Sequence, residues 1–171
     1  MFGDAGPYYG GMTAFRTVFV ILAAGLILAG CAGTPVPPEV GLRSDGSIPV
    51  AAAPPDSPNC VTSYVDPAVD EVHGAIPLDR GSLGPDEARA EIRRILVSLD
   101  RIEILADVPG YLHAVQYSAL WKFPDDVEFW FPADEPVVHF RSAARLGHSD
   151  MGVNRKRMEA VRAAFQSSPQ K

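Results

Sequence analysis

An apolar block near the N-terminus limits how much of this 171-residue chain can form a folded domain. The block extends from Val18 to Gly30 and follows a single base, Arg16. It is shorter than the roughly 18 apolar residues that a membrane-spanning helix requires. A short apolar block behind a base is typical of a secretory signal peptide, so residues 1–30 are predicted to be removed on export. Met12 is an alternative start, because the residues before it include an acid and no base.

The end of the apolar block carries a second signal. Its last residues and the one that follows, Leu28-Ala29-Gly30-Cys31, resemble the lipobox of bacterial lipoprotein precursors. The resemblance implies that Cys31 is acylated, becomes the first mature residue and holds the protein on a membrane, since several acyl chains anchor stably. Ala32 stands where an aspartate would direct a Gram-negative lipoprotein to the inner membrane. We therefore expect a cell-envelope protein, on the periplasmic face of the outer membrane if the cell is Gram-negative.

Residues 31–56 have the composition of a tether. Prolines stand at positions 35, 37, 38, 49, 54 and 55, and no apolar face recurs. Proline favours extended polyproline II at about 3.1 Å per residue, so this segment would reach up to roughly 80 Å from the bilayer. We expect a free tether rather than an ordered arm, because little apolar surface is present to offset the entropy of ordering it.

The net charge limits the classes of molecule that the mature chain is expected to bind. The formal net charge is −6, and residues 1–30 contribute one acid and one base, so their removal leaves the balance unchanged. An acidic protein of this kind is not expected to bind nucleic acid. The partners predicted are the membrane, through the lipid, and an anionic ligand or an envelope protein.

The remaining chain predicts one domain over residues 57–166, followed by a disordered tail over 167–171. Apolar residues at helical spacing predict a helix over 85–99, which begins with a proline and two acids. A second helix is predicted from a cap at Ser149 or Asp150 to about Gln166. Alternating or β-branched runs predict two hairpins, with strands over 102–106 and 111–118 and over 127–131 and 137–141. This order predicts a two-layer α+β fold, with a four-stranded, mainly antiparallel sheet and both helices on one face.

Three blocks of this domain carry a family resemblance: residues 57–61, residues 125–129 and the long block 141–155. Together they resemble domain-of-unknown-function family 1499, over about residues 57–166. The family has no established activity to transfer. Ala144 stands where the family usually has a second serine, which argues against a catalytic hydroxyl at that position.

The basic block at the junction between the last strand and the last helix is a candidate anion site. The predicted ligand-binding residues are Arg141, Ser142, Arg145, Ser149, Asn154 and Arg155. Guanidinium groups beside the exposed amides of a helix N-terminus attract phosphate, carboxylate or lipid headgroups. The alternative is structural: these arginines would pair with the acidic stretch of Asp125, Asp126 and Glu128 and tie the last helix to the sheet.

Cys60 is the one thiol left after acylation of Cys31, so no intrachain disulfide is available. It would act either as a buried small apolar residue or as a nucleophile with a histidine as base. His73, His113, His139 and His148 are the histidines of the chain, and the sequence does not rank them.

Asp125 and Asp126 would serve as paired carboxylates or, with His148 and Asp150, as metal ligands. Because aspartate is common in turns after proline, the structural interpretation is preferred, and neither a metal nor a cofactor is predicted. No phosphate loop, zinc spacing or serine nucleophile elbow is present in the sequence.

Two classes of function remain. The first is a binding or scaffold module, with an anion or lipid-headgroup site at the strand-to-helix junction. The second is a small hydrolase or transferase that uses Cys60 with His148 or another histidine, or the Asp125 and Asp126 pair. We prefer the first, because the second requires a pocket in which Cys60, a histidine and the basic block converge.

Overall fold

The computed structural model describes residue 37 and residues 39–168. The predicted signal peptide, the lipidation site Cys31 and residues 169–171 of the predicted C-terminal tail lie outside the described residues, whereas Ser167 of that tail belongs to the last helix. Among the helices of the described part, none is long and apolar enough to cross a membrane.

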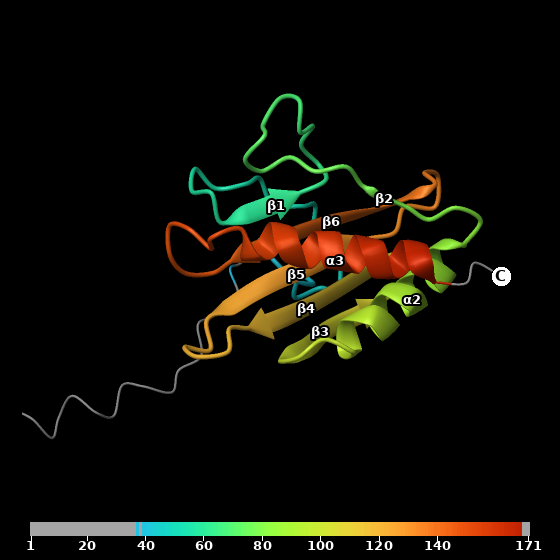
Figure 1. Cartoon of the computed structure of the whole chain (residues 1–171). Helices are drawn as coiled ribbons and strands as arrows, with labels where there is room; N and C mark the ends of the chain where they lie inside the picture. The colour runs from blue at the N-terminus through green and yellow to red at the C-terminus, as the bar shows by residue number, and fades with distance from the viewer. Residues whose placement is uncertain (1–36, 38, 169–171) are drawn as a thin grey trace, which may run out of the picture. The chain divides into compact units, whose positions relative to one another are not determined.

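The domain consists of an antiparallel sheet with two helices on one of its faces (Figure 1). The elements in chain order are β1 (Cys60–Thr62), β2 (Leu78–Asp79), α2 (Pro85–Val97), β3 (Ile102–Val108), β4 (Tyr111–Tyr117), β5 (Pro124–Trp130), β6 (Val137–Ala144) and α3 (Val153–Ser167). The predicted α+β class is confirmed, together with both helices. The sheet has six strands rather than the predicted four.

The strands lie in the order β1-β6-β5-β4-β3, and β2 pairs with the start of β6. Both predicted hairpins are present, as β3–β4 and β5–β6. The two missed strands have three and two residues. Strands this short show no alternation, and both form only because β6, more than 50 residues further along the chain, offers them an edge.

The helices cover the sheet with their apolar sides. The start of α2 is stabilised by Glu87, whose carboxylate accepts a hydrogen bond from the Gly84 amide at 2.8 Å. Asp150 stabilises the start of α3 by accepting from the amides of Gly152 and Asn154, at 2.9 and 2.7 Å. The core that the helices seal includes Ile92, Leu96, Leu112, Val127, Phe129, Val138, Phe140, Met158, Val161 and Phe165. Burying each such side chain contributes about 1.5–3 kcal/mol.

The opposite face of the sheet is covered by the segment that the sequence predicts to be a free tether. We call residue 37 and residues 39–50 the arm. Val40 is buried, the Gly41 amide donates to Glu128 Oε1 at 3.3 Å, and Trp130 Nε1 donates to the Pro49 carbonyl at 2.8 Å. The structure thus differs from the expectation for this stretch. The sheet supplies aromatic surface and buried polar groups to the arm, which the composition of the arm does not reveal.

Candidate functional site

The two faces of the sheet differ in chemistry because successive strand residues point to opposite sides. The helix side is mostly apolar. On the arm side, β4 contributes Tyr111 and His113, β5 contributes Asp126 and Glu128, and β6 contributes Arg141. All five side chains are buried. This charged, covered surface is the arm-side face, and it holds the candidate site.

A chain of three side chains crosses the centre of the arm-side face. His113 Nε2 lies 2.8 Å from Asp126 Oδ1, and Arg145 donates to both oxygens of Asp126, from Nε at 2.8 Å and from Nη2 at 2.7 Å. Burial alone would raise the pKa of Asp126, but the hydrogen bonds from Arg145 and His113 outweigh it and lower that pKa below its ordinary value. Asp126 is therefore a carboxylate at neutral pH.

The carboxylate of Asp126 determines which ring nitrogen of His113 donates. Because a carboxylate accepts hydrogen bonds, Nε2 is the nitrogen that carries a proton toward Asp126, and a neutral imidazole with this tautomer has its lone pair on Nδ1. No described residue forms a hydrogen bond with Nδ1. The Asp126 and Arg145 pair thus holds His113 in one orientation, with an acceptor nitrogen available to another molecule.

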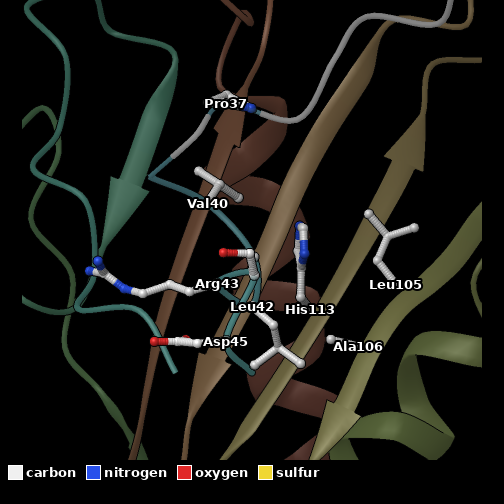
Figure 2. Close-up of a pocket in the computed structure, with 10 residues that line it drawn as sticks. Pro37, Val40, Leu42, Arg43, Asp45, Leu105, Ala106 and His113 are labelled. Carbon is white, nitrogen blue, oxygen red and sulfur yellow. The ribbon is translucent and has the colours of Figure 1, made fainter. Parts of the chain in front are cut away.

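His113 lines a pocket of about 730 Å³ between the arm and the edge of the sheet (Figure 2). The pocket is lined by Pro37, Val40, Gly41, Leu42, Arg43, Ser44, Asp45, Leu105, Ala106 and His113. In Figure 2, Leu42 and Leu105 lie on either side of the imidazole, whereas Arg43 and Asp45 point away from it. The lining of the pocket thus combines apolar side chains with polar groups of the arm.

A β-bulge shapes the wall of the pocket formed by β3. The register between β3 and β4 shifts between Ile104 and Ala106, so Leu105 is an extra residue on the edge strand. Bulges bend the strand locally and redirect a side chain. Here the bulge lies beside His113, since Ala106 pairs with it.

A second polar cluster lies next to the first and supports the arm. Glu128 accepts a hydrogen bond from the Tyr111 hydroxyl at 2.5 Å and from Arg141 Nη1 at 3.4 Å, besides the Gly41 amide. Burial, reinforced by the charge of Glu128, raises the pKa of Tyr111, so the hydroxyl keeps its proton and donates. The cluster satisfies a buried carboxylate and attaches the arm to the sheet.

A different polar network lies on the helix side and joins α3 to the sheet. Arg157 donates to Asp125 Oδ2 at 2.6 Å and to Ser142 Oγ at 2.9 Å, and it also contacts Gln116. The Ser142 hydroxyl donates to Asn154 Oδ1 at 2.6 Å. Every one of these side chains is held by others of the network, so the network explains structure rather than ligand binding.

The predicted anion-site residues do not converge. Arg141 and Arg145 lie on the arm-side face, whereas Ser142 and Asn154 belong to the helix-side network. The Arg155 guanidinium donates to the carbonyls of Val72 and Gly74, both at 3.1 Å. The remaining predicted residue, Ser149, accepts a hydrogen bond from the Met151 amide at 3.3 Å in the loop before α3.

The groups that would attract an anion at this junction are already occupied. Arg141 and Arg145 pair with Glu128 and Asp126, and the amides at the start of α3 bond to Asp150. Of the acidic stretch, Asp125 is the residue that links the last helix to the sheet, through Arg157. The structural alternative thus describes these contacts.

Cys60 lies on the arm-side face, where its surroundings favour the protonated thiol. The thiol is 4% exposed, and burial raises its pKa to about 11, although the charge of Arg141 acts in the opposite direction. No histidine forms a hydrogen bond with Cys60 within the described part of the chain. These features match the buried-residue interpretation rather than that of a nucleophile.

The other histidines lie away from the His113 pocket. His73 bonds to Asp70 at 2.7 Å and to the Ser57 carbonyl at 3.1 Å, and His139 stacks on Tyr64. His148 is exposed in the loop before α3. His113 is therefore the histidine that combines burial, an orienting carboxylate and a pocket.

Asp125 and Asp126 do not act as a pair, because they point to opposite faces of β5. Asp125 contacts Arg157 on the helix side, whereas Asp126 contacts Arg145 and His113 on the arm side. Within the described residues, no group of three or more histidine, cysteine or acidic side chains is placed to hold a metal ion.

His113 was one of four histidines that the sequence did not rank. Tyr111 was not among the predicted site residues, and the arm was predicted to be part of a free tether. Strand alternation alone places Tyr111 and His113 on one face of β4. It does not reveal that Asp126 lies beside His113, because that contact depends on the pairing of β4 with β5.

Comparison with known proteins gives a family and no activity. A family model described as a protein of unknown function, DUF1499, matches residues 51–165. No curated protein and no solved structure matches the chain. Because the family model covers well over half of the sequence, this protein belongs to the DUF1499 family.

Proposed function

We propose that this protein is a lipid-anchored binding module of the cell envelope whose ligand occupies the pocket between the arm and the sheet. The observation that carries the proposal is His113, held by Asp126 and Arg145 at a pocket of about 730 Å³. Pockets of about 300–1,000 Å³ with apolar walls and a few fixed polar groups are typical of small-molecule sites.

The chemistry of the pocket defines the class of ligand. Leu42 and Leu105 offer apolar contacts, and His113 Nδ1 offers one oriented hydrogen-bond acceptor. We therefore propose a small molecule that combines an apolar surface with a hydrogen-bond donor, such as a hydroxyl group. Because the arm forms one wall, binding also requires the arm to stay on the sheet.

Binding is better supported than catalysis. An aspartate behind a histidine is a common way to orient a general base, but a covalent mechanism also needs a nucleophile within hydrogen-bond reach. No serine, threonine or cysteine side chain bonds to His113 in the part of the chain that the structure describes. The Cys60 thiol, with its pKa of about 11, is protonated at neutral pH.

The membrane anchor is proposed on the sequence around Cys31. The apolar block and the lipobox-like Leu28-Ala29-Gly30-Cys31 support a lipid on the Cys31 thiol. The absence of an aspartate at position 32 supports the outer membrane as its location if the cell is Gram-negative. Mass spectrometry of the mature protein tests this: a diacylglycerol adduct on Cys31 is expected, and an unmodified thiol there contradicts it.

Two naphthalene probes test the pocket. 2-Naphthol has an apolar ring and one hydroxyl donor, whereas 2-methoxynaphthalene has the same ring without the donor. We expect the wild-type protein to bind 2-naphthol about tenfold more tightly in a calorimetric titration, because one hydrogen bond contributes about 1.4 kcal/mol. Equal affinity for both probes, or no binding of 2-naphthol, contradicts the proposed site.

Three variants test whether the difference in affinity between the two probes arises in the pocket. His113→Phe keeps an aromatic ring and should abolish the preference for 2-naphthol. Leu42→Asp should lower the affinity for both probes, because it replaces an apolar side chain of the pocket with a charged one. Ile76→Asp, at a residue that is 68% exposed and outside this pocket, is the matched control and should bind both probes as the wild type does.

A further inference from the structure

The tip of the β4–β5 hairpin exposes an unusual amount of apolar surface. Leu120 is 77% exposed, Trp121 70% and Phe123 49%, in one short loop. Lys122 lies between the two aromatic residues, and no described residue forms an ion pair with it. Clustered exposed apolar side chains on a soluble domain usually mark an interaction site.

The composition of the tip favours one kind of partner. Tryptophan is enriched where hydrocarbon meets water at a bilayer surface, because its ring is apolar and its N–H needs a polar partner. A lysine beside it can keep its ammonium group at the lipid headgroups while its methylenes are buried. A protein groove would not require this combination of an indole, a phenyl ring and a free base.

The neighbouring loop adds apolar surface at the same end of the sheet. The β6–α3 loop follows the end of β6, which pairs with the start of β5, so it lies beside the hairpin (Figure 1). Leu146 and Met151 of this loop are 46% and 88% exposed. The apolar end of the domain is thus formed by two loops.

The course of the arm brings the N-terminal chain to this end. Pro49 bonds to Trp130 near one end of the sheet, and Gly41 bonds to Glu128 nearer its middle. In Figure 2, Pro37 lies further along in that direction, toward the end at which β4 finishes. Pro37, the first described residue of the arm, therefore lies toward the end of the sheet that carries the β4–β5 hairpin.

The length of chain before the arm then limits how the anchored domain can stand on a membrane. Five residues, 32–36, separate Cys31 from Pro37, and even fully extended they span about 20 Å. A domain of this size is roughly 35 Å across. A lipid on Cys31 would therefore hold the Pro37 end of the domain nearest to the bilayer, rather than let the domain stand off on the long tether expected from the sequence.

We propose that the tip of the β4–β5 hairpin, with Trp121 at its centre, docks into the interfacial region of the membrane that carries the Cys31 lipid. The partner is a lipid bilayer surface. This inference rests on the lipid anchor proposed above. Docking would fix the orientation of the domain and hold the pocket close to the headgroups.

Tryptophan quenching by brominated lipid tests the proposal on the full mature lipoprotein in phosphatidylcholine vesicles. The chain has two tryptophans, and Trp130 is 7% exposed and bonded to the arm. The difference between the wild type and Trp121→Phe therefore reports Trp121. We expect phosphatidylcholine brominated in its acyl chains to quench at least half of the Trp121 emission.

A displaced tryptophan provides the control. Trp121→Phe combined with Val69→Trp places an indole in the loop between β1 and β2, where Val69 is 82% exposed. This indole should be quenched at least fivefold less than Trp121. Lipidated protein with unquenched Trp121, or with equal quenching at both positions, overturns the docking surface but leaves the anchor intact. Mature protein without a lipid on Cys31 overturns the anchor, and the docking inference with it.

Discussion

The two faces of the same sheet are sealed in different ways. On the helix side, Phe129 and Phe140 pack under α2 and α3 in an apolar core. On the arm side, the side chains of Asp126 and Glu128 are buried, and the arm, which has no regular secondary structure, bonds to Glu128 through the Gly41 amide. Alternate residues of β5 therefore serve two purposes: one set stabilises the fold, and the other builds a polar surface with a pocket.

Asp125 and Asp126 show the contrast at neighbouring positions. Each pairs with an arginine, yet the pKa of Asp125 is raised because burial outweighs its bond to Arg157, whereas the pKa of Asp126 is lowered. Asp126 has two partners, Arg145 and His113, and Arg145 contacts both of its oxygens. The additional donors around Asp126 thus account for the opposite directions of the two pKa shifts.

The largest expected effect is on the helix side. Phe129→Ala removes a fully buried ring from the centre of the core and should lower the free energy of unfolding by about 3–5 kcal/mol, measured by urea denaturation. Val97→Ala, at a half-exposed position of α2, is the control and should change it by less than about 0.5 kcal/mol. Similar losses for both variants would show that the helices do not seal this core.

The next effect is on the arm side. Asp126→Asn removes the counter-charge of the buried Arg145 and should lower the free energy of unfolding by about 3 kcal/mol at neutral pH. A change below about 1 kcal/mol would mean that the Asp126 and Arg145 pair is accessible to water.

The pH dependence of stability separates the two aspartates. The folded pKa of Asp126 is lowered, so its contribution is complete above the unfolded value of about 3.9 and is lost as the pH falls through the folded pKa. Asp126→Asn should therefore lose less stability than the wild type between pH 5 and acid conditions, to about pH 2.

The contribution of Asp125 to stability should change with pH in the opposite direction to that of Asp126. Its folded pKa is raised, so the contribution of its protonated form is complete below the unfolded value of about 3.9 and is lost as the pH rises through the folded pKa. Carboxyl-carbon NMR titration measures both groups directly. If the two aspartates titrated with pKa values in the reverse order, the distinction between the faces would be wrong.

A smaller effect tests the contact between the arm and the β3–β4 hairpin. Gly110 has a φ of +82°, and a Cβ there would lie 3.3 Å from Ile48 Cδ1 of the arm. Gly110→Ala should cost about 1 kcal/mol from backbone strain and also loosen the arm, seen as faster exchange of the Trp130 indole N–H that donates to Pro49. Gly147→Ala, with a φ of +90° and open space around the Cβ, should show the strain without loosening the arm.

The smallest expected effect is at Cys60. With a pKa raised to about 11, the native thiol should resist iodoacetamide at pH 7.5 and react only after unfolding in urea. Mass spectrometry of the alkylated protein measures this. Stoichiometric labelling of the native state would mean that the arm-side face is open at Cys60.

Local patterns predicted the regular elements well. The helical spacing of Ile92, Ile95 and Leu96 lies within α2, and the hairpins lie close to the predicted residues. The patterns missed β1 and β2, which exist only through their distant partner. They also failed for the arm, because its stability derives from Glu128 and Trp130 on the sheet and not from its own residues.

The site shows the same division. Composition and periodicity were sufficient for the α+β class and the acidic charge, and the residues of block 141–155 carried most of the family resemblance. The pairing of strands in the sheet separates the residues of that block: Arg141 lies on the arm side and Ser142 on the helix side. Strand pairing also places Asp126 of β5 beside His113 of the neighbouring strand β4. The physical reason is the pleat: neighbours in the sequence point to opposite faces, and the register between strands, which is a long-range property, selects the partners on each face.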